Sequence, residues 1–299
     1  MKDVFIYQAI RSPRARAKEN GGLHDLLPQE VLQQLYQHLV ERTGLDPAVV
    51  GEVILGCVTQ HGEQAGNIAK ASVMFAGWPS SVGGMTVNRF CSSGIDAIGL
   101  GALKIAAGQE QAIVAGGVEM MSRVPMLADQ AKVFMDPAFA ARCQMLMMGS
   151  GADLIASLNN VTRETADMIA VQSQQRAAHA RDNGYFKSIV PVYNPVKDIT
   201  VTQDECIRAD ATVAALGELA PAFAGIGAKG VDALQLAANE ELDEIEHIHT
   251  AGNSPAMADA AALALLGDGE LGAALGLKPR ARLVASASAS DDPLQVLSG

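Results

Sequence analysis

The sequence predicts an α/β fold in which helices cover a mainly parallel sheet. Three observations point to it: strand-like apolar runs alternate with runs of helical length, glycine and proline mark the junctions, and 49% of the 299 residues are hydrophobic. Strands that alternate with helices in this way are typical of α/β layers. A chain of this length forms one large domain or two ordinary ones, with a sizeable core.

The first part of the chain carries most of this alternation. Pro28 begins a helix that Gly44 ends, because proline suits the first turn of a helix and glycine its C-terminal end. Two further helices are expected over residues 66–77 and 93–108. The expected strands are "DVFIYQAI" (3–10), "EVILGCVT" (52–59), "MTVNRF" (85–90) and "QAIVAGGVE" (111–119).

The pattern changes after about residue 123, where methionines cluster and strand signals weaken. One long helix is expected from Arg163 to Gly184. We interpret 123–249 as an excursion from the first layer, which the expected strand "EHIHTAG" (246–252) rejoins. After it, "AMADAAALALLG" (256–267) reads as a helix and "ARLVASASAS" (281–290) as a strand.

The expected domains are therefore residues 1–122 together with 250–280, the inserted domain 123–249, and residues 281–299 as the start of a further domain. Little of the chain follows the last expected strand to build a second sheet around it. Because a lone strand is not a stable unit, either it pairs with the existing sheet or part of the design lies outside these 299 residues.

Composition and charge narrow the class of protein. The net charge is -11, and acidic and basic residues are interspersed, so a nucleic-acid surface is not expected. The apolar run 4–10 is too short for a signal peptide, and charged residues interrupt the run 260–277, so no membrane span is expected. The four cysteines lie far apart without a CxxC pair, which disfavours a metal site or disulfides and indicates a reduced, cytoplasmic setting.

Cys91 stands out by its place in "NRFCSSG" (88–94), where a strand hands over to a helix. Most free cysteines are small buried hydrophobes, and that is the plain alternative for this one. A helix N-terminus, however, presents unpaired N–H groups and a positive dipole end that favour the thiolate, which is the nucleophilic form. The small residues after Cys91 leave room for a substrate carbonyl, so the position favours a catalytic nucleophile.

The stretch "NRFCSSGIDAIGLGALKIAAGQEQAIVAGGVEMMSRVPM" resembles the active-site region of the thiolase family. Further similar segments cover essentially the whole chain: "GCVTQHGEQAGNIAK", "SQQRAAHARDNGYF", "DECIRADATVAALGELAPAF" and "HTAGNSPAMADAAAL". The resemblance implies a thiolase-like α/β/α layered fold with a loop domain inserted in its first half. It also implies an acyltransferase in which Cys91 holds an acyl thioester during cleavage of 3-ketoacyl-CoA or condensation of acetyl-CoA. Coenzyme A is then a substrate, and no tightly bound cofactor or metal is expected.

The resemblance also implies contacts to CoA. Met148 matches a residue of the pantetheine tunnel, Arg208 one that approaches the adenine nucleotide, and Phe223 an aromatic near the adenine. Ala251 and Ser254 lie in the segment that touches the CoA arm. The plain alternatives are a core methionine, a solvated charge and a core aromatic.

The sequence departs from the family pattern in two ways. Pro255-Ala256 stands where the family has Ser-Gly, and proline offers neither a hydroxyl nor an N–H, so that CoA contact is lost unless Ser254 substitutes. The family's Asn-Glu-Ala-Phe, Gly-His-Pro and Cys-x-Gly-Gly motifs do not occur, and with them go a base, a second cysteine and an oxyanion donor. His247 and His249 flank an expected strand and read as ordinary strand histidines rather than that base.

Three functions stay open on the sequence. The first is a thiolase whose C-terminal half is absent or carried by a second chain; the second is a catalytically incomplete protein that binds CoA or a partner subunit. The third is a decarboxylating ketoacyl synthase, which "GGVEMMSRVPM" disfavours. The resemblance further implies a homodimer or homotetramer that pairs through "MTVNRF", whose exposed edge would otherwise invite aggregation.

Overall fold

The computed structural model describes residues 2–299, which divide into two compact units. Unit 1 consists of Met1–Asp129, Phe186–Cys206 and Met257–Ser286, and unit 2 of Gln130–Tyr185, Ile207–Ala256 and Ala287–Gly299. Unit 1 thus takes in residues 186–206, which the sequence placed in the inserted domain. Each unit is described by itself below. Among the described residues, no helix is long and apolar enough to cross a membrane.

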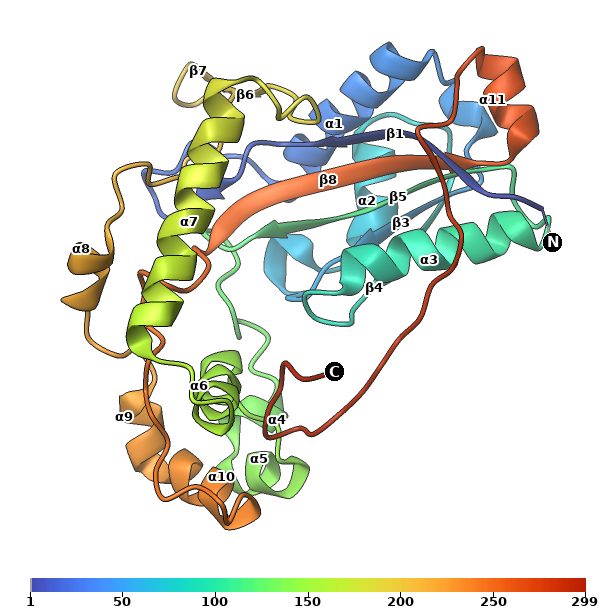
Figure 1. The fold of residues 1–299 in the computed structure, drawn as a ribbon. Helices are drawn as coiled ribbons and strands as arrows, with labels where there is room; N and C mark the ends of the chain where they lie inside the picture. The colour runs from blue at the N-terminus through green and yellow to red at the C-terminus, as the bar shows by residue number, and fades with distance from the viewer. Residues whose placement is uncertain (1) are drawn as a thin grey trace. The chain divides into compact units, whose positions relative to one another are not determined.

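Unit 1 is built on a seven-stranded sheet with helices on both faces (Figure 1). Its strands are β1 (Phe5–Arg11), β2 (Ala15–Arg16), β3 (Glu52–Gly56), β4 (Gly83–Val87), β5 (Ala112–Met120), β8 (Ala258–Gly267) and β9 (Ala281–Arg282). Its helices are α1 (Pro28–Thr43), η1 (Pro47–Val49), η2 (Gly62–Gln64), α2 (Ile68–Phe75), α3 (Ser93–Ala106) and α11 (Gly269–Leu275). A separate hairpin joins β6 (Val192–Asn194) to β7 (Ile199–Val201).

The strand order is β4-β3-β5-β8-β1-β9, with β2 paired to β8. The pairs β3–β4 and β3–β5 are parallel, whereas β8 runs antiparallel to β5, β1 and β2, and β9 runs antiparallel to β1. The sheet is therefore mixed, and the expectation of a mainly parallel sheet holds for its β4-β3-β5 half. The antiparallel half exists because the segment expected to be a helix is itself a strand.

Strand β8 corrects the helix predicted over residues 256–267. Alanine and leucine are strong helix formers, so "ADAAALALLG" has helical propensity. In the sheet, however, β8 lies between β5 and β1 and pairs with both along most of its length. A central strand buried on both faces reads as a continuous apolar run that periodicity alone does not distinguish from a helix.

Two cores lie on opposite faces of the sheet. On one face, α1 and α2 pack their buried side chains, among them Leu32, Leu35 and Ile68, against the strands. On the other face, α3 packs through Ala97 and Ile105. Figure 1 shows α3 lying along that face of the sheet. Helix α1 begins at Pro28 and ends before Gly44 at φ +67°, as the sequence predicted.

Unit 2 is helical and has a small core around Leu154, Ile245 and Leu294. Its helices are α4 (Lys132–Met135), α5 (Pro137–Cys143), α6 (Met148–Leu158), α7 (Arg163–Asp182), α8 (Val213–Gly217), α9 (Ala224–Ile226), η3 (Gly227–Val231) and α10 (Asp232–Ala238). The long predicted helix is confirmed as α7. The strand predicted over residues 246–252 is wrong, because that segment has no regular structure.

The strand predicted near residues 281–289 is confirmed for Ala281–Arg282 alone, which pair with β1 as β9. Residues 283–290 have no regular structure. Residues 287–299 belong to unit 2, where Leu294 is buried. The assignment of 281–299 to a further domain stays a prediction.

Candidate active site

Cys91 lies in the short turn between β4 and α3, directly before the helix N-cap Ser92. Its side chain is exposed. The sequence predicted a cysteine within one turn of the helix start, and this placement is confirmed. Cys91 therefore lies at the N-terminal end of α3, where the helix dipole is positive. The N–H groups of Ser92 and Ser93 at this end are paired with the carbonyls of Arg89 and Phe90, both at 3.1 Å.

The buried hydroxyl of Ser93 holds the turn that carries Cys91 through two hydrogen bonds. Ser93 Oγ accepts a hydrogen bond from the N–H of Arg89 at 2.8 Å and donates one to the carbonyl of Phe90 at 2.6 Å. Between them Phe90 has a φ of +48°, a left-handed conformation that bulky residues rarely adopt. Such a conformation persists where surrounding contacts fix it, so these two hydrogen bonds hold the backbone on which Cys91 sits.

Two neighbours bring the helix start into place. A Cβ added to Gly56 of β3 would lie 2.6 Å from Ser93 Cβ, so glycine is what lets α3 begin this close to the sheet. Arg89 forms an ion pair with Asp96, the acidic residue in the first turn of α3. The ion pair thus balances the acidic charge in the first turn of α3.

The remaining cysteines have different surroundings. Burial, with the nearby charge of Glu119, raises the pKa of the Cys57 thiol to about 12, so Cys57 is inert at neutral pH. Burial also raises the pKa of Cys206. Cys143 is exposed but belongs to unit 2, at the C-terminal end of α5. Cys91 is thus the exposed cysteine that directly precedes a helix.

Helix α3 is buried on one side and apolar on the other. Its sheet-facing side is closely packed, yet Ile95 and Leu103 remain 74% and 58% exposed. Helix α3 is therefore half-buried rather than enclosed. The strands β3, β4, β5 and β8 contact α3 on its sheet-facing side, whereas Ile95 and Leu103 lie on its exposed side.

The predicted CoA residues all belong to unit 2. Met148 begins α6, and the Phe223 ring lies against the next residue, since a Cβ added to Gly149 would lie 2.0 Å from Phe223 Cζ. The structure therefore brings Met148 and Phe223 close together. Arg208 is exposed, and Gln174 of α7 holds its backbone N–H at 2.7 Å.

Ala251 and Ser254 lie in a tight turn fixed by Asn253. The Asn253 side chain accepts a hydrogen bond from the N–H of Thr250 at 2.8 Å and donates to the Ile248 carbonyl at 3.0 Å. It also donates to the buried carboxylate of Asp167 on α7 at 2.8 Å. The turn is therefore tied to α7 as well as to itself.

His247 and His249, which the sequence placed beside a strand, instead meet a buried acid. Asp153 of α6 is fully buried. Its carboxylate accepts hydrogen bonds from His247 Nδ1 at 2.9 Å and from His249 Nδ1 at 2.6 Å. Burial alone would raise the pKa of Asp153, but the hydrogen bonds from both histidines outweigh it and lower that pKa. A single aspartate in the otherwise apolar helix segment "GADLIA" was the one sequence signal for this cluster.

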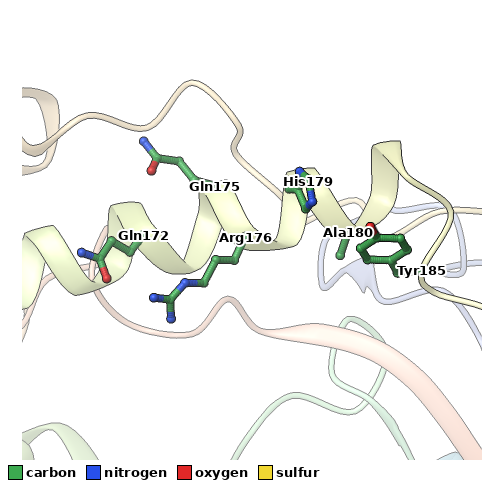
Figure 2. Close-up of a pocket in the computed structure, with 6 residues that line it drawn as sticks. All are labelled: Gln172, Gln175, Arg176, His179, Ala180 and Tyr185. Atoms are coloured by element: carbon green, nitrogen blue, oxygen red, sulfur yellow. The ribbon is translucent and has the colours of Figure 1, made fainter.

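A surface hollow also lies along α7 (Figure 2), lined by Gln172, Gln175, Arg176, His179, Ala180 and Tyr185. It is open to solvent, and it contains no predicted site residue. Among the described residues, no group of three or more His, Cys, Asp or Glu side chains is placed to hold a metal ion. The turn at Cys91 in unit 1 and the Met148–Phe223 region in unit 2 therefore remain two separate candidate regions.

Comparisons with known proteins agree on one family. The family model "Thiolase, N-terminal domain" matches residues 4–233. The 3-oxoadipyl-CoA/3-oxo-5,6-dehydrosuberyl-CoA thiolase of Escherichia coli K12 is 34% identical over 98% of this chain and 73% of its own length. A 3-ketoacyl-CoA thiolase of Escherichia coli O139:H28 is 34% identical over 98% and 72%. The crystal structure of the Bacillus anthracis acetyl-CoA acetyltransferase superposes with a TM-score of 0.77 at 33% identity, covering 94% of this chain and 69% of that one.

Proposed function

The chain belongs to the thiolase family, and from this premise we propose that it transfers acyl groups between CoA thioesters through Cys91. The observation that carries the proposal is the exposed cysteine on a strand-to-helix turn that Ser93 holds. A thiol there meets the needs of a nucleophile: access, a fixed direction and a helix end that favours its anion.

The proposed acyl transfer uses Cys91 as the nucleophile. Cys91 Sγ attacks the carbonyl carbon of an acyl-CoA, and the carbonyl electron pair moves to oxygen. In condensation the acyl-CoA is acetyl-CoA: when that pair returns, the bond from carbon to the CoA sulfur breaks, CoA leaves as a thiol with the proton from Cys91, and the acetyl group stays on Cys91 as a thioester. In cleavage the attacked carbon is the 3-keto carbon: the bond between C2 and C3 breaks instead, acetyl-CoA leaves with the proton from Cys91 on C2, and the shortened acyl group stays on Cys91 as a thioester. Transfer to a second acceptor then frees the cysteine. The positive end of the α3 dipole is proposed to stabilise the negative charge that forms on this oxygen.

Substrate recognition is proposed to lie in unit 2. Met148 and Phe223, brought together at the start of α6, offer an apolar and aromatic surface for pantetheine and adenine. Arg208 suits a phosphate because its guanidinium donates several hydrogen bonds in a fixed plane. Ala251 and Ser254 are proposed to contact the CoA arm, with Ser254 in place of the hydroxyl that Pro255 cannot supply.

The substrates proposed are 3-ketoacyl-CoA for cleavage and acetyl-CoA for condensation, in the fatty acid β-oxidation branch of lipid metabolism. Relatives whose alignments cover 98% of this chain, at 34% identity, are named for such thioesters. This similarity favours catalysis over a catalytically incomplete protein that binds CoA or a partner. The cytoplasm, with its reducing conditions, is the proposed compartment.

The proposed assembly is a homodimer or homotetramer in which two copies of the outer strand β4 pair. Strand β4 has one neighbour, β3, so its other edge carries backbone groups without strand partners in the sheet.

Single-turnover release of CoA tests the proposal. The chain is mixed with excess acetyl-CoA, and free CoA is counted by chromatography. We expect release approaching one equivalent per chain for wild type and for the control Cys143→Ser, and none for Cys91→Ser. Equal release from the Cys91→Ser variant would refute Cys91 as the nucleophile.

A further inference from the structure

The imidazole of His247 bridges two carboxylates. Its Nδ1 lies 2.9 Å from Oδ2 of Asp153, and its Nε2 lies 3.1 Å from Oδ2 of Asp232, at the start of α10. An ionised carboxylate offers acceptors alone, so both ring nitrogens must carry a proton to make both hydrogen bonds. The geometry is that of an imidazolium between two anions.

Asp153 is the fixed end of this bridge. Besides the two histidine rings, its carboxylate accepts the backbone N–H groups of Ile248 and His249, both at 3.1 Å. It is fully buried, and its pKa is lowered, so it remains a carboxylate at neutral pH. Asp153 therefore pins the irregular segment 247–249 to α6.

Asp232 is the second end. Gly227 leaves room for its carboxyl group, since a Cβ there would lie 2.3 Å from Asp232 Oδ1. That Oδ1 is buried and has no hydrogen-bond partner, so the contact from His247 to Oδ2 is what holds this carboxylate. Protonated His247 thus links α6, α10 and its own segment.

The pinned segment leads directly into the proposed CoA turn. The Ile248 carbonyl, fixed through the N–H that Asp153 holds, accepts the side chain of Asn253. The titratable groups that face the segment are Asp153 of α6, Asp232 of α10, His249 of the segment itself, and Asp167 of α7, which pairs with Arg163.

We propose that doubly protonated His247 is a positioning residue that fixes the Ala251–Ser254 turn for CoA, and that loss of one ring proton to water loosens the turn. The proposal rests on the CoA site of the proposed function. Once a ring nitrogen is deprotonated, its lone pair faces a carboxylate, and one arm of the bridge is lost.

The direction of the pH dependence follows from the contacts. Burial would lower the pKa of His247, but the hydrogen bonds and charges of Asp153 and Asp232 prevail and raise it. A raised folded-state pKa means that the stabilisation is complete below about pH 6.5, the ordinary value for histidine, and is lost as pH rises through the raised value. CoA affinity should therefore fall on the alkaline side.

Two measurements on the full chain test this: hydrogen exchange of amides 248–254, corrected for intrinsic exchange, and the dissociation constant for CoA, each from pH 6 to 9. We expect protection and affinity to fall together in wild type, with CoA binding weakening at least about tenfold, the scale of one charge-assisted hydrogen bond. The control His61→Gln, at an exposed position in unit 1, should match wild type.

His247→Gln should show weak, nearly pH-independent protection and binding, because its amide cannot donate to both carboxylates. Asp232→Asn should fold like wild type and move the midpoint to lower pH, since it removes one of the two charges that favour the imidazolium. An unmoved midpoint in Asp232→Asn, or protection independent of pH in wild type, would overturn the proposed positioning role of His247. Absence of CoA binding at every pH, with protection still pH-dependent, would instead refute the proposed CoA site.

Discussion

At the scale of single residues, the candidate site depends on how one serine holds one cysteine. Ser93 closes the turn from both sides, to Arg89 and to Phe90, and Cys91 lies inside the loop that it closes. The sequence motif suggested small residues for access to the sulfur. The structure adds a second reason for Ser93, because its hydroxyl supports a left-handed Phe90.

The Ser93→Ala variant should therefore distinguish two roles of Ser93: holding the Cys91 turn through hydrogen bonds, and leaving space for a substrate to reach the Cys91 sulfur. Each lost hydrogen bond is worth about 1 kcal/mol, so we expect the free energy of unfolding to fall by about 1–2 kcal/mol. We also expect iodoacetamide to alkylate Cys91 several times more slowly, read by peptide mass spectrometry. Ser92→Ala is the matched control, since the Ser92 side chain makes no capping hydrogen bond. Equal alkylation rates in the two variants would contradict the role of Ser93.

At the scale of elements, the close approach of β5 to β8 explains why residue 116 of β5 is a glycine. A Cβ added to Gly116 would lie 1.9 Å from the carbonyl oxygen of Ala262, in backbone that the sheet holds on both sides. The same change at Gly99 of α3 would meet nothing within 4 Å.

Gly116→Ala should lower the free energy of unfolding by at least about 2 kcal/mol, because neither strand can shift without breaking pairs. Gly99→Ala should raise it by about 0.5–1 kcal/mol, since alanine is the better helix former. Urea unfolding followed by circular dichroism measures both. A Gly116→Ala protein as stable as wild type would mean that β5 and β8 are not packed as described.

The elements also show how far sequence reasoning reached. Helices α1 and α7 could be predicted because their signals are local: Pro28 and Gly44 mark the ends of α1, and Gly184 marks the end of the long stretch that forms α7. Strand β8 could not, because pairing with β5 and β1 overrides the helical propensity of its alanines and leucines. For the site, the place of Cys91 followed from its motif. The bridge from Asp153 to His247 joins residues 94 apart in sequence, which no local pattern reports.

At the scale of the whole molecule, unit 1 leaves two features open for a partner: the outer edge of β4 and the apolar face of α3 around Ile95 and Leu103. Strand edges of this kind are normally covered, charged or paired. The pairing of two β4 strands in a homodimer satisfies the first feature.

Light scattering coupled to size exclusion checks the assembly. We expect a mass of about 62 kDa, twice the 31.1 kDa of one chain, at micromolar concentration. Dissociation on dilution should follow one concentration-dependent transition. A mass of 31.1 kDa across the whole micromolar range would exclude the proposed dimer.

The central claim is that Cys91 accepts an acyl group, and mapping that group tests it most directly. Folded chain is incubated with acetyl-CoA, quenched in acid, digested and analysed by mass spectrometry for acetyl thioesters on each of the four cysteines. The account predicts the acetyl group on the Cys91 peptide first, with Cys57 unmodified because it is buried and its pKa is raised. Acetylation of Cys143 or Cys206 ahead of Cys91, or of no cysteine at all, would contradict it.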